Sequence, residues 1–454
     1  MEGQLSTSAV AHIIDDRPLS GFQLWTIVLC GVVVILDGFD TQCMGFLVPH
    51  IADSLHIPIP SFGPVLSAAL IGLMIAAMAS GPIADRWGRR SVVIVSVVVF
   101  GIFALLTARA DSLRELVLYR FLTGLGLGGA MPNAVALTAE YTPRRIQPNV
   151  VGAIFVGMPA GALIASQAAS ILIPLWGWRS VFVVGGVLPL LLALLLIKVL
   201  PESVRFLSAT GSDPERVAAI LRRIDGRQST VDSPQSTVDR DMSAHDEPRK
   251  GVPVKHLFTE GRAAGTLLLW VPFFMNLLML YFFISWLPAL LRQSGMPPSA
   301  GVEAVAMFSL GGIFGTLFEG SVMKVFGART LLLFEFLICT ALIASLAQVG
   351  ASLAPMLMVS LVLGICMQGA QSGLNALAAG FYPTAVRATG IGWALGVGRI
   401  GSIVGPSLGG VLLSLNWTPD RIFMAGIAPA LCAAIAIVLT RWLPDRSNAF
   451  RTAA

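Results

Sequence analysis

Two carboxylates stand three residues apart in a strongly apolar stretch near the start of the chain. Asp37 and Asp40 flank Gly38 and Phe39 in this stretch. If the stretch is helical, this spacing places both acids on one face. A charged side chain costs about 2.5–3.5 kcal/mol at the centre of an inserting membrane helix, so such acids usually face a cavity, pair with a cation or carry protons. We predict that Asp37 and Asp40 couple the protein to protons; a purely structural pair is the alternative.

Two arginines also fall inside apolar stretches. Asp40 is expected about eight residues before the outer end of its helix and Arg120 about seven after the outer start of another, so both lie about 10–12 Å deep. They can therefore meet, either as a fixed ion pair or as one that protonation opens. Arg399 is expected at mid-membrane, too deep for its charge to reach an interface, and needs an anion. Glu319 or Glu335 could serve, but both are predicted nearer to helix ends, so a substrate carboxylate is favoured.

A loop between two apolar stretches carries a fixed pattern of glycine, acid and arginine. The segment 81–90 reads Gly-Pro-Ile-Ala-Asp-Arg-Trp-Gly-Arg-Arg. A solvated basic turn would supply the arginines but not the spacing of Gly81, Asp85 and Gly88. The segment resembles the signature loop of the major facilitator superfamily, G-x-x-x-D-R-x-G-R-R, at every fixed position.

That resemblance implies a gate at the cytoplasmic side. Asp85 would bond to the facing half and hold the gate shut, and Arg86, Gly88, Arg89 and Arg90 would complete it. The matching loop in the second half has Lys324 where the acid would stand, which predicts an asymmetric gate. A second segment, Pro201-Glu202-Ser203-Val204-Arg205-Phe206-Leu207, resembles the superfamily signature P-E-S-x-R-[FW]-L, although a merely structural helix end would explain it equally well.

The composition requires that most side chains lie in lipid. Hydrophobic residues make up 55% of the 454 residues and charged residues 12%, against about 25% charged in an average soluble chain. Apolar runs long enough to cross a hydrocarbon layer recur along the chain. The expected class is an all-α membrane protein with twelve transmembrane helices. These helices are expected at 24–48, 61–83, 90–109, 113–139, 148–174, 178–200, 262–291, 301–323, 329–350, 354–380, 386–414 and 419–442.

The positions of the basic residues indicate how the chain is oriented in the membrane. The net charge is +5, but Lys and Arg stand between apolar runs and most fall on one side of the predicted helices, as on cytoplasmic loops. Nucleic acid is therefore not an expected partner, and both termini are expected in the cytoplasm of a cell whose inner membrane holds the chain. No removable signal peptide is evident.

Catalysis is not indicated by any motif. The chain lacks the phosphate-binding loop G-x-x-x-x-G-K-[ST] and the zinc motif H-E-x-x-H, and its five histidines lie outside the predicted helices. The five cysteines show no C-x-x-C spacing. We therefore expect no enzyme activity, no cofactor, no metal site and no ATP-driven step.

The chain is expected to consist of two copies of one six-helix unit. Gly81 and Gly320 are 239 residues apart, as are Pro49 and Pro288, which we expect to end the first helix of each copy. Parallel six-helix halves of this kind hold substrate between them in many alternating-access carriers. The predicted divisions are a cytoplasmic segment at 1–23, bundles at 24–200 and 262–442, a cytoplasmic linker at 201–261 and a tail at 443–454. Within the linker, residues 214–224 predict an amphipathic helix on the membrane surface.

Aromatic and amide side chains at a depth similar to that of the buried charges could hold a ring. Each of them alone is more often a packing residue than a ligand. Asn276 is favoured because it is the repeat counterpart of Asp37. The candidates are Phe39, Asn133, Asn276, Tyr281, Gln368, Gln371 and Trp393.

A narrower resemblance covers most of the chain. Asp37-Gly38-Phe39-Asp40, the loop at 81–90 and the segment 120–133, Arg-Phe-Leu-Thr-Gly-Leu-Gly-Leu-Gly-Gly-Ala-Met-Pro-Asn, are similar to the aromatic acid:proton symporter family. The resemblance implies import of benzoate-type or hydroxybenzoate-type anions with protons, and a functional role for both acids of the D-G-[FY]-D motif. The expected partners are a small aromatic carboxylate, the proton and the lipid bilayer, for a monomeric protein.

The main alternative on the same fold is an organic-anion or drug:proton antiporter. The glycines from Gly396 to Gly410 fit the pattern G-x8-G-P-x2-G-G, which marks antiporters of the superfamily when it lies in helix 5. Here it lies in helix 11, so we interpret these glycines as sites of close packing. A channel is a third possibility, but duplicated halves with buried charges suit a carrier better.

Overall fold

The described part of the chain consists of helices joined by short loops and contains no strand. The computed structural model describes residues 14–15, 18–210, 214–225, 254–259, 261–346 and 352–440. The N-terminal half contains α2 (Gly21–Leu55), η1 (Ile59–Phe62), α3 (Gly63–Trp87), α4 (Arg89–Thr107), α5 (Leu113–Tyr141), α6 (Gln147–Phe155), α7 (Gly157–Trp176) and α8 (Arg179–Val199). The C-terminal half contains α11 (Ala263–Gln293), α12 (Pro298–Phe326), α13 (Ala328–Leu346), α14 (Leu353–Phe381), α15 (Thr384–Ser414), α16 (Pro419–Ala425) and α17 (Ile427–Thr440).

Twelve long helical segments cross the bundle, as the sequence predicts. Eleven of them, with α6–α7 and α16–α17 each taken as one segment, are long and apolar enough to span a membrane. The twelfth, α5, has 29 residues and carries Arg120 among its buried residues. Because α5 packs against both α3 and α4, its charged residue lies inside the bundle and is shielded from lipid. The predicted all-α membrane class is confirmed.

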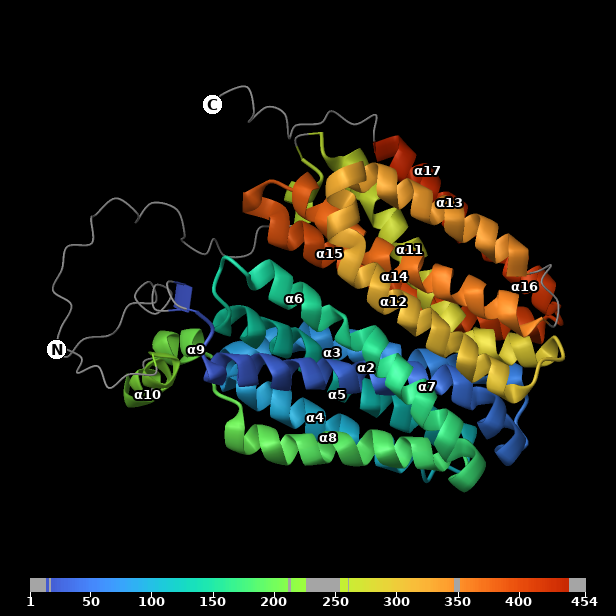
Figure 1. Cartoon of the computed structure of the whole chain (residues 1–454), viewed down its shortest axis with the longest axis horizontal. Helices are drawn as coiled ribbons and strands as arrows, with labels where there is room; N and C mark the ends of the chain where they lie inside the picture. The colour runs from blue at the N-terminus through green and yellow to red at the C-terminus, as the bar shows by residue number, and fades with distance from the viewer. Residues whose placement is uncertain are drawn as a thin grey trace.

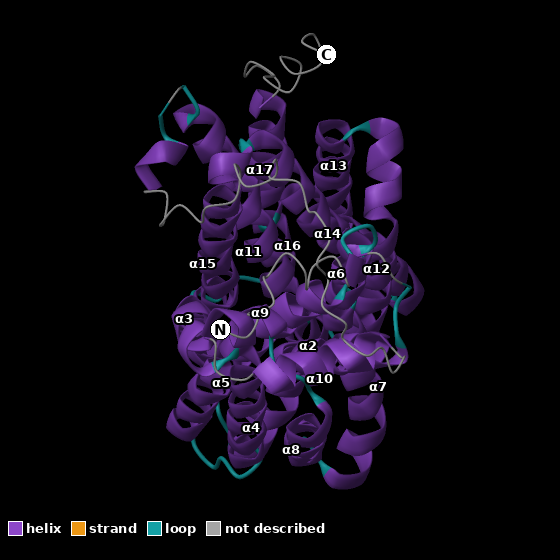
Figure 2. Cartoon of the chain, turned by 90° about the vertical axis from the view of Figure 1, so that its left-hand side faces the viewer, coloured by secondary structure: helices purple, strands orange, loops and turns teal. Residues whose placement is uncertain are grey.

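The two halves repeat one packing scheme. In the N-terminal half α2 packs on α7, α3 on α5 and α4 on α8; in the C-terminal half α11 packs on α15, α12 on α14 and α13 on α17. Figure 1 shows the halves as two layers, blue to green below and yellow to red above, with their long helices running in similar directions. Figure 2, turned by 90°, shows the same two groups of helices at either side of a central region.

Hydrogen bonds and an ion pair join the halves at one end of the bundle. The halves meet through α2 with α11, α3 with α15 and α7 with α12. Ser67 bonds to Ser407 (2.7 Å), and Arg292 bonds to Asp53 (2.7 Å) and to the carbonyl of Pro49 (3.1 Å). These bonds lie at the end opposite the linker, which we call the distal end; the other is the linker end. The bundle is therefore latched at its distal end.

The first helix of each half continues past the proline that was expected to end it. Pro49 and Pro288 were expected to end these helices, but both lie inside them, in α2 and α11. A proline removes one backbone donor and frees the carbonyl group four residues before it, and neighbouring helices or local adjustments satisfy that group. A tertiary contact is also present at Pro49, whose carbonyl accepts from Arg292 of α11. The expected ends were wrong because a sequence does not show such tertiary compensation.

The linker is described in part. Its residues 211–213, 226–253 and 260, the initial residues 1–13 and 16–17, and the predicted tail at 443–454 lie outside the described residues. Helices α9 (Val204–Thr210) and α10 (Pro214–Asp225) follow α8. The apolar face of α10, with Val217, Ile220 and Ile224, is buried in one hydrophobic cluster with the end of the N-terminal half. The predicted amphipathic helix is therefore present, but it docks on protein rather than on the membrane surface.

Close helix contacts in this fold depend on glycine at specific positions. Gly124 of α5 faces α3 so closely that an added Cβ would overlap the carbonyl oxygen of Ala69. Small residues permit such approach in membrane bundles, where close packing replaces the hydrophobic effect as the source of association.

We predict that Gly124→Val destabilises the bundle by about 1–3 kcal/mol, because the branched side chain must push α3 away from α5. Gly152→Val is the matched control, since a Cβ at Gly152 meets no atom within 4 Å. Both variants would be purified in detergent and their melting temperatures compared with that of the wild type. A loss of equal size in both variants would contradict this account of Gly124.

Candidate functional site

A fully buried ion pair joins α2 to α5. The Nη1 of Arg120 donates to Oδ1 of Asp40 at 2.9 Å, and Nη2 donates to the Asp40 carbonyl oxygen at 3.2 Å. Both side chains are 1% exposed. The Arg120 guanidinium also lies over the ring of Phe182, 5.8 Å from its centroid. The meeting of Asp40 and Arg120 inferred from their depths is therefore present in the structure.

The buried ion pair does not use all of its hydrogen-bonding atoms. Oδ2 of Asp40 and Nε of Arg120 are buried without a hydrogen-bond partner among the described residues. A carboxylate oxygen in this position can accept a proton, which converts it to a donor. The arginine remains charged at any physiological pH, so protonation of Asp40 would leave the guanidinium without its counterion.

Asp37 lies one turn before Asp40 and forms no ion pair among the described residues. Its Oδ1 accepts a hydrogen bond from Thr41 Oγ1 at 3.0 Å, while its Oδ2 is buried without a partner in the described structure. Gly38 brings this part of α2 against the backbone of Met158 on α7. The acid is thus held in a tightly packed region with one oxygen free to bind a proton.

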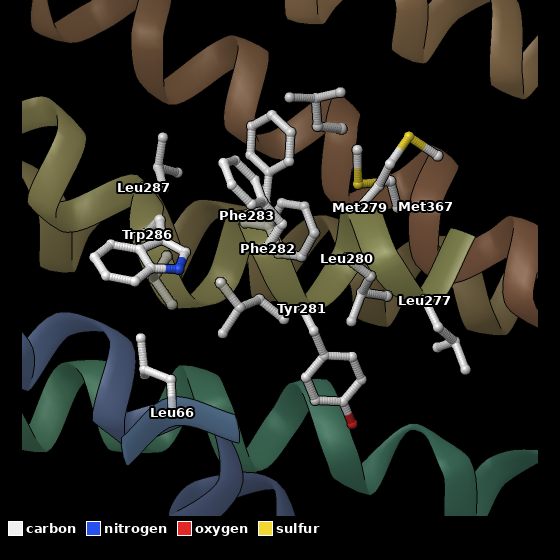
Figure 3. Packing of buried hydrophobic residues seen from close by; sticks show 14 of the residues in the cluster. Leu66, Leu277, Met279, Leu280, Tyr281, Phe282, Phe283, Trp286, Leu287 and Met367 are labelled. Atoms are coloured by element: carbon white, nitrogen blue, oxygen red, sulfur yellow. The ribbon is translucent and has the colours of Figure 1, made fainter. Parts of the chain in front are cut away.

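Arg399 projects from α15 towards the other half. Its Nη1 bonds to the hydroxyl of Tyr281 at 3.3 Å, and it is close enough to Asp37 for the two charges to interact. No ion pair joins Arg399 to an acid within the described residues, so its guanidinium retains capacity for an anion. Figure 3 shows Phe282 and Phe283 directed towards the helices of their own half, whereas Tyr281 points the other way, towards the N-terminal half. Tyr281 and Arg399 therefore border the region between the halves.

Amide side chains form a second polar group on α11 and α14. The Nδ2 of Asn276 donates to the carbonyl of Met367 at 3.0 Å and to Oε1 of Gln371 at 3.1 Å. Asn276 Oδ1 remains unpartnered and buried in the described structure. Gln368, on the same helix α14, lies against Gly312 of α12. Asn276 and Gln371 thus form one unit, and Gln368 faces a different helix.

Three of the residues predicted to bind substrate instead contact other parts of the protein. The ring of Phe39 lies against Gly185 of α8, inside the N-terminal half. Asn133 donates to the carbonyl of Gly129 in its own helix at 2.8 Å. Trp393 stacks on Trp270 with 6.1 Å between ring centroids, on a different face of α15 from Arg399. These side chains were expected at similar depths in the membrane, but they do not face one common surface. Each points in a different direction from its helix.

The two signature segments form a single cluster at the linker end. Gly88 adopts a positive φ of 84°, and an added Cβ there would overlap the carboxylate of Glu202. The backbone N–H of Arg90 donates to Glu202 Oε1 at 3.0 Å. Arg89 pairs with Glu140, which also accepts from the Ser203 hydroxyl at 2.6 Å. The loop at 81–90 is therefore anchored to the end of helix α8 and to α5.

Sequence reasoning missed Glu140 in this cluster. The signal available was an acid at the end of α5, close to the depth of the basic loop that follows α3. Asp85 and Arg86 are exposed, and Asp85 makes no bond to the facing half among the described residues. Since the halves are latched at the distal end, the gating roles of Asp85, Arg86, Gly88, Arg89 and Arg90 remain predictions for the state that closes the linker end.

Comparisons with known proteins agree with this architecture. The family model described as Major Facilitator Superfamily matches residues 30–354 and 299–453. The 4-hydroxybenzoate transporter PcaK of Pseudomonas aeruginosa is 40% identical over 442 residues, covering 95% of each chain. The gallate transporter of Pseudomonas putida is 38% identical and covers 94% of this chain and 93% of its own.

Solved structures share the fold at lower identity. The xylose transporter XylE from E. coli, in a partially occluded inward open conformation, has a TM-score of 0.72 and 17% identity, with 94% of this chain and 98% of that chain covered. A bacterial homologue of the lysosomal transporter Spinster, inward-facing and unoccupied, has a TM-score of 0.62 with 18% identity, covering 92% of this chain and 95% of that chain. At these identities the likeness establishes the arrangement of helices.

We predict that the two partners of the buried ion pair differ in what their loss costs. Asp40→Asn leaves a permanently charged arginine unpaired and should cost about 3–5 kcal/mol. Arg120→Gln should cost less, because Asp40 can become neutral by binding a proton. The double variant should be more stable than Asp40→Asn alone. The measurement is the melting temperature of the purified variants at neutral pH.

The half-exposed pair between Asp53 and Arg292 provides the control. Asp53 is 60% exposed and Arg292 32%, so Asp53→Asn should change stability by less than about 1 kcal/mol. If Arg120→Gln proved as destabilising as Asp40→Asn, the proposed ability of Asp40 to take up a proton would be contradicted.

Proposed function

Because this chain belongs to the Major Facilitator Superfamily, we propose that it imports an aromatic carboxylate together with protons by alternating access. The observation that carries the proposal is the set of buried and half-buried charges between and beside the halves. One arginine, Arg120, is paired with Asp40, while another, Arg399, has no acid bonded to it within the described residues. An anion that enters with a proton can satisfy both groups. The names of the relatives, which include transporters of 4-hydroxybenzoate and gallate, support an aromatic acid as that anion.

Arg399 is the proposed contact for the substrate carboxylate. A guanidinium presents two parallel N–H donors that match a carboxylate, and such paired bonds are stronger than neutral ones. Tyr281 bonds to the same guanidinium and limits its orientation. Asn276 and Gln371 add amide groups on the C-terminal half, where the unpartnered Oδ1 of Asn276 can accept a hydrogen bond from a ring hydroxyl.

Asp37 and Asp40 are the proposed proton acceptors. A proton that binds Oδ2 of Asp40 removes the negative charge that holds Arg120, so the guanidinium can turn to a second anion. Asp37 feels the charge of Arg399, so its protonation state and anion binding at Arg399 influence each other. Proton and carboxylate would thus be taken up together because each reduces the cost of burying the other.

Alternating access would proceed by exchange of two latches. In the present conformation the distal end is held by Arg292, Asp53, Ser67 and Ser407. Closure of the linker end would bring the loop that carries Asp85 against the C-terminal half while the distal bonds break. With both termini in the cytoplasm of the cell, the linker end faces the cytoplasm and the present conformation is the one that releases imported substrate.

Transport in proteoliposomes tests the proposal. Purified protein would be reconstituted and given labelled 4-hydroxybenzoate outside, with the external buffer either more acidic or more alkaline than the lumen. A symporter accumulates the substrate only when the outside is more acidic. Accumulation driven by the opposite gradient would favour the organic-anion or drug:proton antiporter instead, and uptake indifferent to the gradient would contradict proton coupling.

We predict that Asp37→Asn abolishes gradient-driven accumulation but retains exchange of labelled for unlabelled substrate across the membrane. The amide is similar in size to the carboxyl group and can still accept from Thr41, so the variant should fold. Exchange needs only the substrate-bound form to change its access, whereas accumulation needs the proton to leave. Accumulation at the wild-type level in this variant would remove Asp37 from the proton pathway.

We predict that Arg399→Lys weakens binding of the acid at least tenfold, because lysine keeps the charge but lacks the planar two-donor group. Arg399→Ala should remove binding almost entirely. The amide analogue of the substrate should bind weakly to the wild type and change little in either variant, since it has no carboxylate to lose. Binding would be measured by titration calorimetry for acid and amide. Equal losses for both compounds would make Arg399 structural and leave Arg120 as the anion contact.

A further inference from the structure

A second pair of carboxyl groups is buried in the C-terminal half. Glu319 of α12 is 5% exposed and Glu335 of α13 is 6% exposed. Each lies seven residues from the linker end of its helix, which places both about 10 Å inside the bundle. They were considered as partners for Arg399, but no ion pair joins either acid to a basic residue within the described ranges. The mechanism proposed above makes no use of them.

The two carboxyl groups meet beside a glycine of α14. The position that a Cβ at Gly369 would take lies 3.0 Å from Oε2 of Glu319 and 3.1 Å from Oε1 of Glu335. Both oxygens therefore approach the same point on α14. Ionised carboxylates offer only acceptors, so two carboxyl groups that share such a place can be joined by a hydrogen bond only if one of them carries a proton.

The surroundings provide no other source of neutralisation. Leu332 and Met323 border the same space near Gly373 of α14. The titratable groups that face the pair are the free thiols of Cys339 on α13 and Cys366 on α14. Oε1 of Glu319 and Oε2 of Glu335 are buried with no partner in the described structure. Two ionised acids in such a place would repel each other and would be desolvated without compensation.

The matching place in the N-terminal half holds no acid. Ser80 and Ser96 stand 239 residues before Glu319 and Glu335. Gly129 corresponds to Gly369, because it lies beside Ser96 as Gly369 lies beside Glu335. An added Cβ at Gly129 would overlap the Ser96 hydroxyl. The fold therefore accepts small neutral side chains at this position, and helix packing alone does not explain two carboxyl groups.

We propose that Glu319 and Glu335 form a proton-binding site distinct from Asp37 and Asp40. In one state the pair shares a single proton between a carboxylic acid and a carboxylate. Uptake of one more proton from the linker-end compartment converts the carboxylate to a second carboxylic acid and leaves the pair neutral. Because α12 packs against α14 and also against α7 of the other half, a change of charge here alters the contact on which the halves move.

Infrared spectroscopy of the purified full-length protein tests the binding of the proton. At neutral pH the wild type should show the carbonyl band of a protonated carboxyl group, and Glu319→Gln/Glu335→Gln should lose the part of the band that belongs to this pair. Each single variant should shift the band, because a different group now shares the hydrogen bond. Each should also bind one proton fewer than the wild type on acidification.

Two controls separate this site from other acids. Glu303→Gln removes an exposed acid on the same helix α12 and should leave the band unchanged. Asp37→Asn reports any contribution of the acids in α2. If the double variant kept the whole band of the wild type while remaining folded, the pair would hold no proton and the proposal would be wrong.

The effect on transport rests on the proposed function and needs its own measurement. In vesicles of one orientation, the rate of substrate exchange would be followed while only the pH on the linker side is varied. The wild-type rate should depend on this pH, and Glu335→Gln should weaken the dependence while it still accumulates substrate, with the remainder due to Asp37 and Asp40. A dependence unchanged in Glu335→Gln would overturn the link to transport. Failure of symport itself would instead appear as absent accumulation in the wild type.

Discussion

The exclusion of water from the helix bundle is the constraint on which the other features depend. A charge buried there must be neutralised by another side chain, by a bound anion or by a proton, since the solvation it has lost amounts to several kcal/mol. Arg120 meets this requirement through Asp40. Arg399 has Tyr281 as a hydrogen-bond partner, and the proposed substrate supplies its anion. Glu319 and Glu335 lack a bonded cation in the described structure, which leaves a proton as their neutralising group.

Close packing of helices determines which parts of the protein can move when a buried charge changes its partner. Helices α3 and α5, and likewise α12 and α14, approach so closely at glycines that a Cβ would overlap the facing backbone. Such pairs move as rigid units because no space allows one helix to shift past the other. In the proposed mechanism, breaking the bond between Asp40 and Arg120 would therefore move whole units against each other where they meet, along α2 with α11 and α7 with α12.

Helix length and depth were predictable from the sequence, whereas side-chain direction was not. Apolar runs predicted the twelve segments, and counting residues from the helix ends placed Asp40 near Arg120, because rise per residue is constant. Phe39 has a depth similar to Asp40 but points at Gly185, since rotation of α2 is set by packing with α7 and α8. The contact of Glu202 with the loop at Gly88 joins segments over 100 residues apart and depends on tertiary structure. Which end of the bundle is closed is a property of conformation and leaves no local signal.

The differences between the halves matter more for chemistry than their likeness. The duplicated halves have matching helix packing, but their polar residues differ. Asp37 corresponds to Asn276, and Glu319 and Glu335 correspond to Ser80 and Ser96. Each half thus carries its acids at a position where the other half is neutral. A carrier that moves an anion with protons benefits from this arrangement, because two equivalent proton sites around a symmetric centre would repel the substrate from both sides. In the proposed mechanism, the arginine in α15 of the C-terminal half binds the carboxylate, while the acids in α2 of the N-terminal half take up protons. The asymmetry would therefore let one carrier take up both ions in the same step.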